Sequence, residues 1–197
     1  MKTIDFYFDF GSPYSYVAYK RLQQLQQNIT FDIQYYPVIL GGIFKATNNQ
    51  SPVMVPAKAK YLFKDLNDWS KYWQIPFQFN PHFPINTFLL MRAAIGYQAK
   101  YPEQLSKFIE VFFDAMFKQP VNLNLEEQII NTLQQAGFVV EDYQRLIQDE
   151  DIKALAKTKT ENAVKRGLFG VPAFFIDDEM FWGQDRLHFI EQKLQAG

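Results

Sequence analysis

The chain contains no cysteine and only two histidines, and these shortages restrict its chemistry. Without cysteine it can form neither disulfide bonds nor thiolate metal sites. It also cannot act as a disulfide oxidoreductase, because the mixed disulfide of that reaction needs a thiol on the protein. Since His82 and His188 are too few for a histidine-built metal centre, we predict that the protein binds no metal.

An excess of charge of either sign is also missing. The chain has 20 Lys and Arg residues against 21 Asp and Glu residues, a formal net charge of -1. Nucleic acids and anionic membranes attract basic surfaces, so neither is an expected partner. No run approaches the ~18 apolar residues of a membrane span, and the N-terminus lacks the apolar region of a signal peptide. We therefore expect a cytoplasmic protein.

Aromatic side chains, by contrast, are abundant and make up 17% of the 197 residues. With 48% hydrophobic residues, the chain can bury one sizeable core or two small ones that share an interface. Most of the rings are expected in that core. For Tyr14, Tyr16 and Trp182, the sequence leaves open whether they pack in the core or line an aromatic pocket.

The first 37 residues have the pattern of a β-α-β unit. Apolar side chains alternate with polar ones over residues 3–10, which is typical of a strand. Ser12 and Pro13 then suit the N-cap and first position of a helix that we expect to run to about Gln27. A second alternating stretch, 29–37, predicts a strand parallel to the first, joined by a right-handed crossover.

The middle of the chain is predicted to be mostly helical. Residues 38–56 are rich in Gly, Asn and Pro and indicate a loop, whereas helical periodicity dominates from about 57 to 167. Asn124 and Glu127 have the spacing of a capping box at the start of one of these helices. The last helix of this region is expected at about 151–166.

Strand patterns return after this helical region. The apolar run 173–176 is typical of a buried strand, and 180–182 is expected to pair with it antiparallel. Apolar residues from Leu187 onward then have helical spacing. The element order is therefore β-α-β, a large helical insertion, and α-β-β-α. We predict one domain from 1–40 and 167–197, with 41–166 as a helical domain whose final helix packs on the first.

Four segments of the chain resemble the thioredoxin-like superfamily with an inserted helical domain. The chain is more narrowly similar to 2-hydroxychromene-2-carboxylate isomerases and kappa-class glutathione transferases. The segments are Asp5–Tyr16, Gly42–Lys45 with its continuation to Asn49 and Pro52, Phe169–Pro172, and Met180–Leu187. The resemblance implies an α/β thioredoxin-like fold with a large all-helical insertion, in a homodimer.

The resemblance also implies glutathione as cofactor and assigns its contacts residue by residue. Ser12 matches the serine that donates a hydrogen bond to the glutathione sulfur. The other positions matching glutathione contacts are Asn49 near the thiol, Lys58 near the carboxylates, Val171 and the cis proline Pro172 along the backbone, and Gln184 with Asp185 at the γ-glutamyl end. At position 184 the isomerases usually have asparagine and the transferases serine, so the γ-glutamyl contacts of this chain differ in detail.

The residue types fit this assignment, although each also has a purely structural interpretation. A thiol of pKa ~8.5 is more easily ionised beside a helix N-terminus and a hydroxyl donor, which Pro13 and Ser12 would provide. Ser12 can equally cap its own helix, and the two roles are compatible. Asn49 suits a turn, Lys58 a solvated surface and Asp185 the cap of the last helix.

The resemblance predicts a glutathione-dependent isomerase of aromatic catabolism. Its reaction interconverts 2-hydroxychromene-2-carboxylate and trans-o-hydroxybenzylidenepyruvate by reversible addition of a thiolate. One alternative is a kappa-class-like glutathione transferase or peroxidase that acts on small aromatic or electrophilic substrates. Another is a non-catalytic thioredoxin-fold module that only binds peptides.

Overall fold

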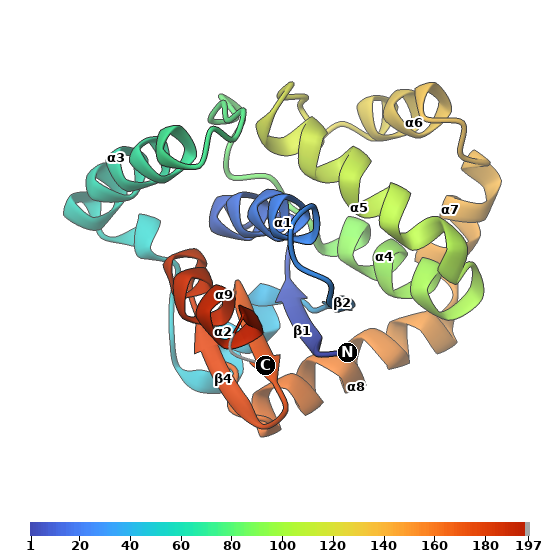
Figure 1. Cartoon of the computed structure of the whole chain (residues 1–197). Helices are drawn as coiled ribbons and strands as arrows, with labels where there is room; N and C mark the ends of the chain where they lie inside the picture. Colours follow the sequence, from blue (N-terminus) through green and yellow to red (C-terminus); the bar gives the residue numbers. More distant parts are fainter. Residues whose placement is uncertain (196–197) are drawn as a thin grey trace.

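The computed structural model describes residues 1–195, which form a four-stranded sheet surrounded by helices (Figure 1). The strands are β1 (Thr3–Phe8), β2 (Asp32–Pro37), β3 (Ala173–Ile176) and β4 (Glu179–Trp182), in the order β2-β1-β3-β4. β1 runs parallel to β2 and antiparallel to β3, and β4 is antiparallel to β3. The predicted parallel opening and the C-terminal hairpin are both confirmed.

Helices cover both faces of this sheet because the strands are apolar on both sides. Phe6 and Phe8 belong to a core cluster shared with α1 (Pro13–Gln26) and α9 (Leu187–Gln195). Tyr7 and Phe175, which point the opposite way, cluster with α2 (Leu40–Thr47) and α8 (Glu150–Lys165). Since successive side chains of a strand alternate in direction, β1 supplies both cores.

The remaining helices lie in the inserted segment, except for the short η2, which lies between β4 and α9. They are η1 (Pro52–Met54), α3 (Pro56–Tyr72), α4 (Phe88–Lys100), α5 (Pro102–Phe117), α6 (Glu126–Gln135), α7 (Val140–Gln148) and η2 (Gln184–Arg186). In Figure 1, α3 lies on one side of α1, with α4 and α5 on the other. Between residues 1 and 195, no helix has the length and apolar character needed to cross a membrane.

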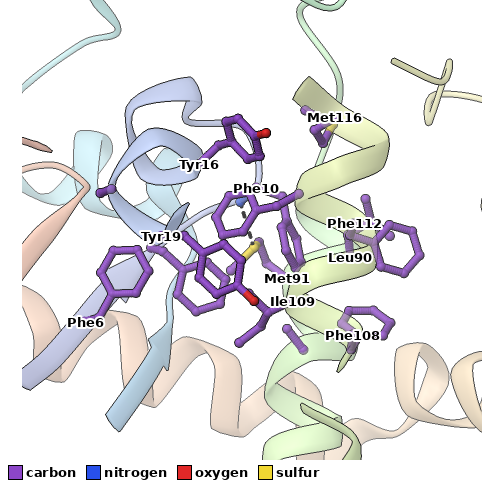
Figure 2. Close-up of a cluster of buried hydrophobic side chains, with 14 of the residues drawn as sticks. Phe6, Phe10, Tyr16, Tyr19, Leu90, Met91, Phe108, Ile109, Phe112 and Met116 are labelled. Carbon is purple, nitrogen blue, oxygen red and sulfur yellow. Dashed lines mark hydrogen bonds between the residues drawn. The ribbon is translucent and has the colours of Figure 1, made fainter. Parts of the chain in front are cut away.

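An aromatic cluster joins the first strand to the inserted helices (Figure 2). Phe10 packs against Phe108 and Phe112 of α5, with ring centroids about 6 Å apart. Its backbone N–H donates to the sulfur of Met91 on α4 at 3.3 Å. Residues from both predicted domains therefore share one hydrophobic core. The division into one domain of 1–40 with 167–197 and another of 41–166 stays a prediction. Residues 196 and 197 of that division lie outside the described part.

The segment from 38 to 56 differs from the prediction made from its sequence. The segment 38–56 was expected to be a loop, but it contains α2 and η1, so that prediction is wrong. The reason is packing: Ile43 is fully buried, and a Cβ on Gly42 would lie only 3.1 Å from Thr160 of α8. Gly42 thus lets α2 approach α8 closely, and tertiary contact overrides the low helix propensity of Gly41 and Gly42.

The predicted capping box at Asn124 is also wrong. α6 begins at Glu126 with Leu125 at the N-cap, and no side chain caps it. The Asn124 side chain instead accepts from the Asn86 N–H at 3.0 Å and donates to the Pro84 carbonyl at 3.4 Å. A side-chain amide that can bond a distant loop does not have to serve its own helix.

Candidate active site

A cavity of about 960 Å³ brings together all seven site residues expected from the sequence. It lies among the start of α1, the end of α2, the first turns of α3, and the segments before β3 and after β4. The seven are Ser12, Asn49, Lys58, Val171, Pro172, Gln184 and Asp185. These positions lie in three widely separated stretches of the chain, at 12, 49–58 and 171–185, so only folding makes them a single site.

Ser12 lies at the N-cap of α1 and lines the cavity. Its Oγ accepts from the Ser15 N–H at 3.2 Å and donates to the Val171 carbonyl at 3.3 Å. The capping role is therefore confirmed. A hydroxyl donor usually lies 2.5–3.0 Å from its acceptor, so the bond to Val171 is long. The hydrogen bond from the Ser12 hydroxyl to the Val171 carbonyl is therefore weak, and the hydroxyl can donate instead to a better acceptor, such as a thiolate.

The start of α1 favours an anion beside Ser12. The first turn contains Pro13, Tyr14 and Ser15 and no acidic residue, so no side chain of that turn opposes the helix dipole. Tyr14 donates its hydroxyl to Asp65 of α3 at 2.7 Å. Burial, and next the hydrogen bond to Asp65, raise the pKa of Tyr14 well above its ordinary value. Tyr14 therefore keeps its proton and adds no negative charge of its own.

A buried carboxylate, Asp9, holds the turn that carries Ser12. Its Oδ1 accepts from the Gly11 N–H at 2.8 Å and the Thr87 hydroxyl at 2.6 Å, and its Oδ2 accepts from the Leu40 N–H at 2.9 Å. Its carbonyl accepts from the Ser12 N–H at 3.0 Å. Burial raises the pKa of Asp9, while the three side-chain bonds act in the opposite direction. Asp9 thus links the turn to α2 and α4.

The side chain of Asn49 connects the loop after α2 to the segment before β3, two parts of the chain that line the cavity. Its amide nitrogen donates to the Phe169 carbonyl at 2.9 Å, and its side-chain oxygen accepts from the Gln50 N–H at 2.8 Å. The bond to Phe169 places the loop after α2 against the segment that ends in Val171 and Pro172. The peptide bond between these two is cis, which confirms the expectation for Pro172.

The other end of the cavity follows β4. Gly183 has φ of +100°, and a Cβ there would lie 2.7 Å from the Asp185 carboxylate, so the turn requires glycine. The next residue, Gln184, is buried. Asp185 forms an ion pair with Arg186, with 3.2 Å between Asp185 Oδ2 and Arg186 Nη1. The expected capping role of Asp185 is wrong, since Asp185 lies within η2 and α9 begins only at Leu187.

One face of α3 contributes residues that the sequence reasoning missed. Tyr61, Asp65 and Trp69 line the cavity together with Lys58. Their spacing of three or four residues puts them on one side of a helix. That spacing was available in the sequence, but the face mixes polar and aromatic residues and does not stand out as apolar. Lys58 forms no ion pair with any residue in 1–195.

The undecided aromatic residues separate into two groups. Tyr14 and Trp182 line the cavity, and the Trp182 ring lies 4.9 Å from that of Phe169. Tyr16 is fully buried and packs against Phe117, so it belongs to the core. Among residues 1–195, no group of three or more His, Asp or Glu side chains is placed to hold a metal ion.

Comparison with known proteins agrees with this geometry. The family model described as DSBA-like thioredoxin domain matches residues 3–195. The chain belongs to this family. This DsbA-like chain is 32% identical to 2-hydroxychromene-2-carboxylate isomerase of Pseudomonas sp. (strain C18), over 95% of its own length and 88% of the relative's. It is 26% identical to glutathione S-transferase kappa 1 of Rattus norvegicus, over 96% and 89% of the two chains.

A solved structure extends the similarity to three dimensions. The structure of a 2-hydroxychromene-2-carboxylate isomerase superimposes on this DsbA-like chain with a TM-score of 0.85 and 29% identity. The match covers 98% of this chain and 95% of that one. The thioredoxin-like fold with a helical insertion, expected from four short segments, is therefore confirmed over nearly the whole chain. The relatives named isomerases support an enzymatic activity.

Proposed function

We propose that this protein is a glutathione-dependent isomerase that interconverts 2-hydroxychromene-2-carboxylate and trans-o-hydroxybenzylidenepyruvate. The observation that carries the proposal is the position of Ser12, which lines the cavity at the start of α1 and whose hydroxyl proton is donated only in a long bond to the Val171 carbonyl. Three relatives named 2-hydroxychromene-2-carboxylate isomerase, at 29–32% identity, support the choice of reaction.

The residues of the cavity fit a tripeptide thiol. The cationic side chain of Lys58 suits a carboxylate, and Asp185 suits the ammonium group of the γ-glutamyl end. The backbone of Val171, beside the cis bond to Pro172, suits an extended peptide that pairs as a strand does. A volume of about 960 Å³ is within the range of sites that enclose a ligand of this size.

Bound glutathione would supply a thiolate that adds reversibly to the conjugated double bond, permits rotation about the resulting single bond and leaves unchanged. Ser12 would donate its hydroxyl proton toward the sulfur in place of the Val171 carbonyl, which stabilises the anionic form. The N-terminus of α1 adds its partial positive charge. Asp9 acts indirectly by holding the Ser12 turn through Gly11 and Leu40.

The experiment that tests the proposal is the isomerisation rate with and without glutathione. We expect Ser12→Ala to lower the glutathione-dependent rate on the order of 10²-fold, the effect of losing one donor to a developing anion. Ser15→Ala is the matched control, because this buried serine lies in the same turn and its hydroxyl has no hydrogen-bond partner within residues 1–195. A Ser12→Ala rate equal to wild type, or a rate independent of glutathione, would reject the mechanism.

A kappa-class-like transferase is the second candidate, because four relatives are named glutathione S-transferase kappa. It would use the same Ser12 site but would consume glutathione by conjugation. Glutathione concentration measured during turnover separates the two functions, since an isomerase leaves it unchanged. Glutathione binding without either activity would instead favour a binding module.

A further inference from the structure

A second cavity, of about 1200 Å³, adjoins the Ser12 cavity. Five residues line both: Gly11, Leu40, Phe44, Ser51 and Phe83. The rest of the second cavity is formed by α2, by α8 and by the chain from Pro84 to the first turns of α4, and most of its lining surface is apolar. Its floor includes Asp9, so it reaches the buried side of the turn that carries Ser12.

Two cationic side chains of this cavity, Lys45 and Arg92, have no carboxylate partner among residues 1–195, and of the two only Arg92 is partly buried. Along α8, Lys153 pairs with Glu150 at 3.2 Å and Lys157 with Glu161 at 3.9 Å. Arg92 of α4 has no carboxylate within ion-pair distance in the described part of the chain. The side-chain oxygens of Asp9 already accept three hydrogen bonds from the protein.

Arg92 is held in place but only partly bonded. Its guanidinium lies over the Phe88 ring at 4.8 Å, and its Nη1 donates to the Ile147 carbonyl at 2.7 Å. Its Nε is buried without a partner among residues 1–195. The Nη2 of this half-buried guanidinium forms no hydrogen bond among residues 1–195, which leaves a donor for a ligand carboxylate.

We propose that the second cavity binds the electrophilic substrate, with its ring among Phe44, Phe83 and Phe88 and its carboxylate on Arg92. This assignment rests on the proposed function. It separates the two ligands by polarity: the Ser12 cavity, which has the more polar lining of the two, suits a tripeptide, and the more apolar second cavity suits an aromatic acid. The reacting carbon would then point toward Gly11, which lines both cavities.

The test uses 4-phenylbutanoate, an aromatic carboxylate that has no conjugated double bond and so cannot react with a thiolate. Its dissociation constant is measured by calorimetry, in the presence and absence of glutathione. We expect Arg92→Gln to weaken binding about tenfold or more, the usual effect of losing a charge-assisted hydrogen bond. Arg92→Lys, which retains the charge, should recover part of the affinity. Lys157→Gln, which removes a paired lysine of the same cavity, should change it little.

A second pair of variants tests the same cavity without changing Arg92. Gly41 lines the cavity, and a Cβ there would meet no atom within 4 Å. We therefore expect Gly41→Phe to obstruct the cavity and Gly41→Ala to leave binding unchanged. Thermal unfolding of each variant shows whether a lost affinity reflects a lost fold.

The outcomes separate this inference from the proposed function. Weakened probe binding in Arg92→Gln and Gly41→Phe, with unchanged glutathione affinity, supports the second cavity as the substrate site. Probe affinity equal to wild type in both folded variants, displacement of the probe by glutathione, or no binding at millimolar probe overturns it. Failure of the proposed function has a different signature, since glutathione would then not bind while the probe still did.

Discussion

The Thr87 hydroxyl donates to the Asp9 carboxylate at 2.6 Å, across 78 residues of sequence. Thr87 occupies the N-cap of α4, yet its side chain makes no capping bond there. The Thr87 hydroxyl therefore holds the Asp9 carboxylate instead of capping its own helix. The same carboxylate oxygen accepts from the Gly11 N–H and so holds the turn that carries Ser12. One buried hydrogen bond thus fixes the active-site turn relative to the inserted helices.

This relationship predicts the effect of Thr87→Val. Valine has nearly the shape of threonine but cannot donate, so the buried carboxylate of Asp9 loses a partner. We expect the free energy of unfolding to fall by about 1–3 kcal/mol, measured by urea denaturation. Thr132→Val is the matched control, because the Thr132 hydroxyl only donates to the Gln128 carbonyl of its own helix. Equal losses in the two variants would contradict a special role for Asp9.

Asp9 also predicts a pH dependence of stability. Because burial raises its pKa above the ordinary 3.8, the folded protein binds more protons than the unfolded chain between 3.8 and the raised value. The free energy of unfolding that Asp9 contributes therefore falls as the pH rises through that window, and recovers as the pH falls. Asp9→Asn cannot titrate, so wild type should gain stability relative to this variant as the pH is lowered toward 4.

The measurement for Asp9 is urea unfolding of wild type and Asp9→Asn at a series of pH values. Asp178→Asn, in the exposed turn between β3 and β4, is the control for removal of a carboxylate as such. A difference between wild type and Asp9→Asn that stays constant with pH would rule out titration of Asp9 in this range.

Two glycines in helices predict opposite effects of the same substitution. A Cβ on Gly96 of α4 would lie 2.8 Å from Leu146 Cδ2 on α7, so Gly96→Ala should destabilise the protein by about 1–3 kcal/mol. Gly41→Ala meets no atom within 4 Å and should stabilise it by up to ~1 kcal/mol through helix propensity. Thermal unfolding of both variants distinguishes the two signs.

A thiol at the Ser12 position tests where the glutathione sulfur would lie. Ser12→Cys would be the only cysteine in the chain. Its thiolate should attack oxidised glutathione, forming a mixed disulfide and releasing one reduced glutathione. Intact-mass spectrometry should detect one glutathionyl group, more quickly than in Ser15→Cys, which places the thiol at a buried site outside the cavity. Equal or slower labelling of Ser12→Cys would argue against a sulfur held beside Ser12.

The sequence alone predicted the parts of the site that depend on neighbouring residues. Alternation before Asp9 indicated β1, and Ser12 followed by Pro13 indicated the capped start of α1. The four short segments that resemble 2-hydroxychromene-2-carboxylate isomerases and kappa-class glutathione transferases led to the fold and to a set of residues that line one cavity. These signals are readable because a strand pattern or an N-cap is decided within a few residues of chain.

The tertiary structure decided what no local pattern records. It formed α2 across Gly41 and Gly42 because the close approach to Thr160 of α8 requires a residue without a side chain. It assigned the Thr87 hydroxyl to Asp9, and it placed Arg92, which has no ion-pair partner among residues 1–195, beside a second cavity. Each of these depends on contacts between residues more than 50 positions apart. Such contacts arise only when the whole core packs, so their partners and distances cannot be read from the sequence near either residue.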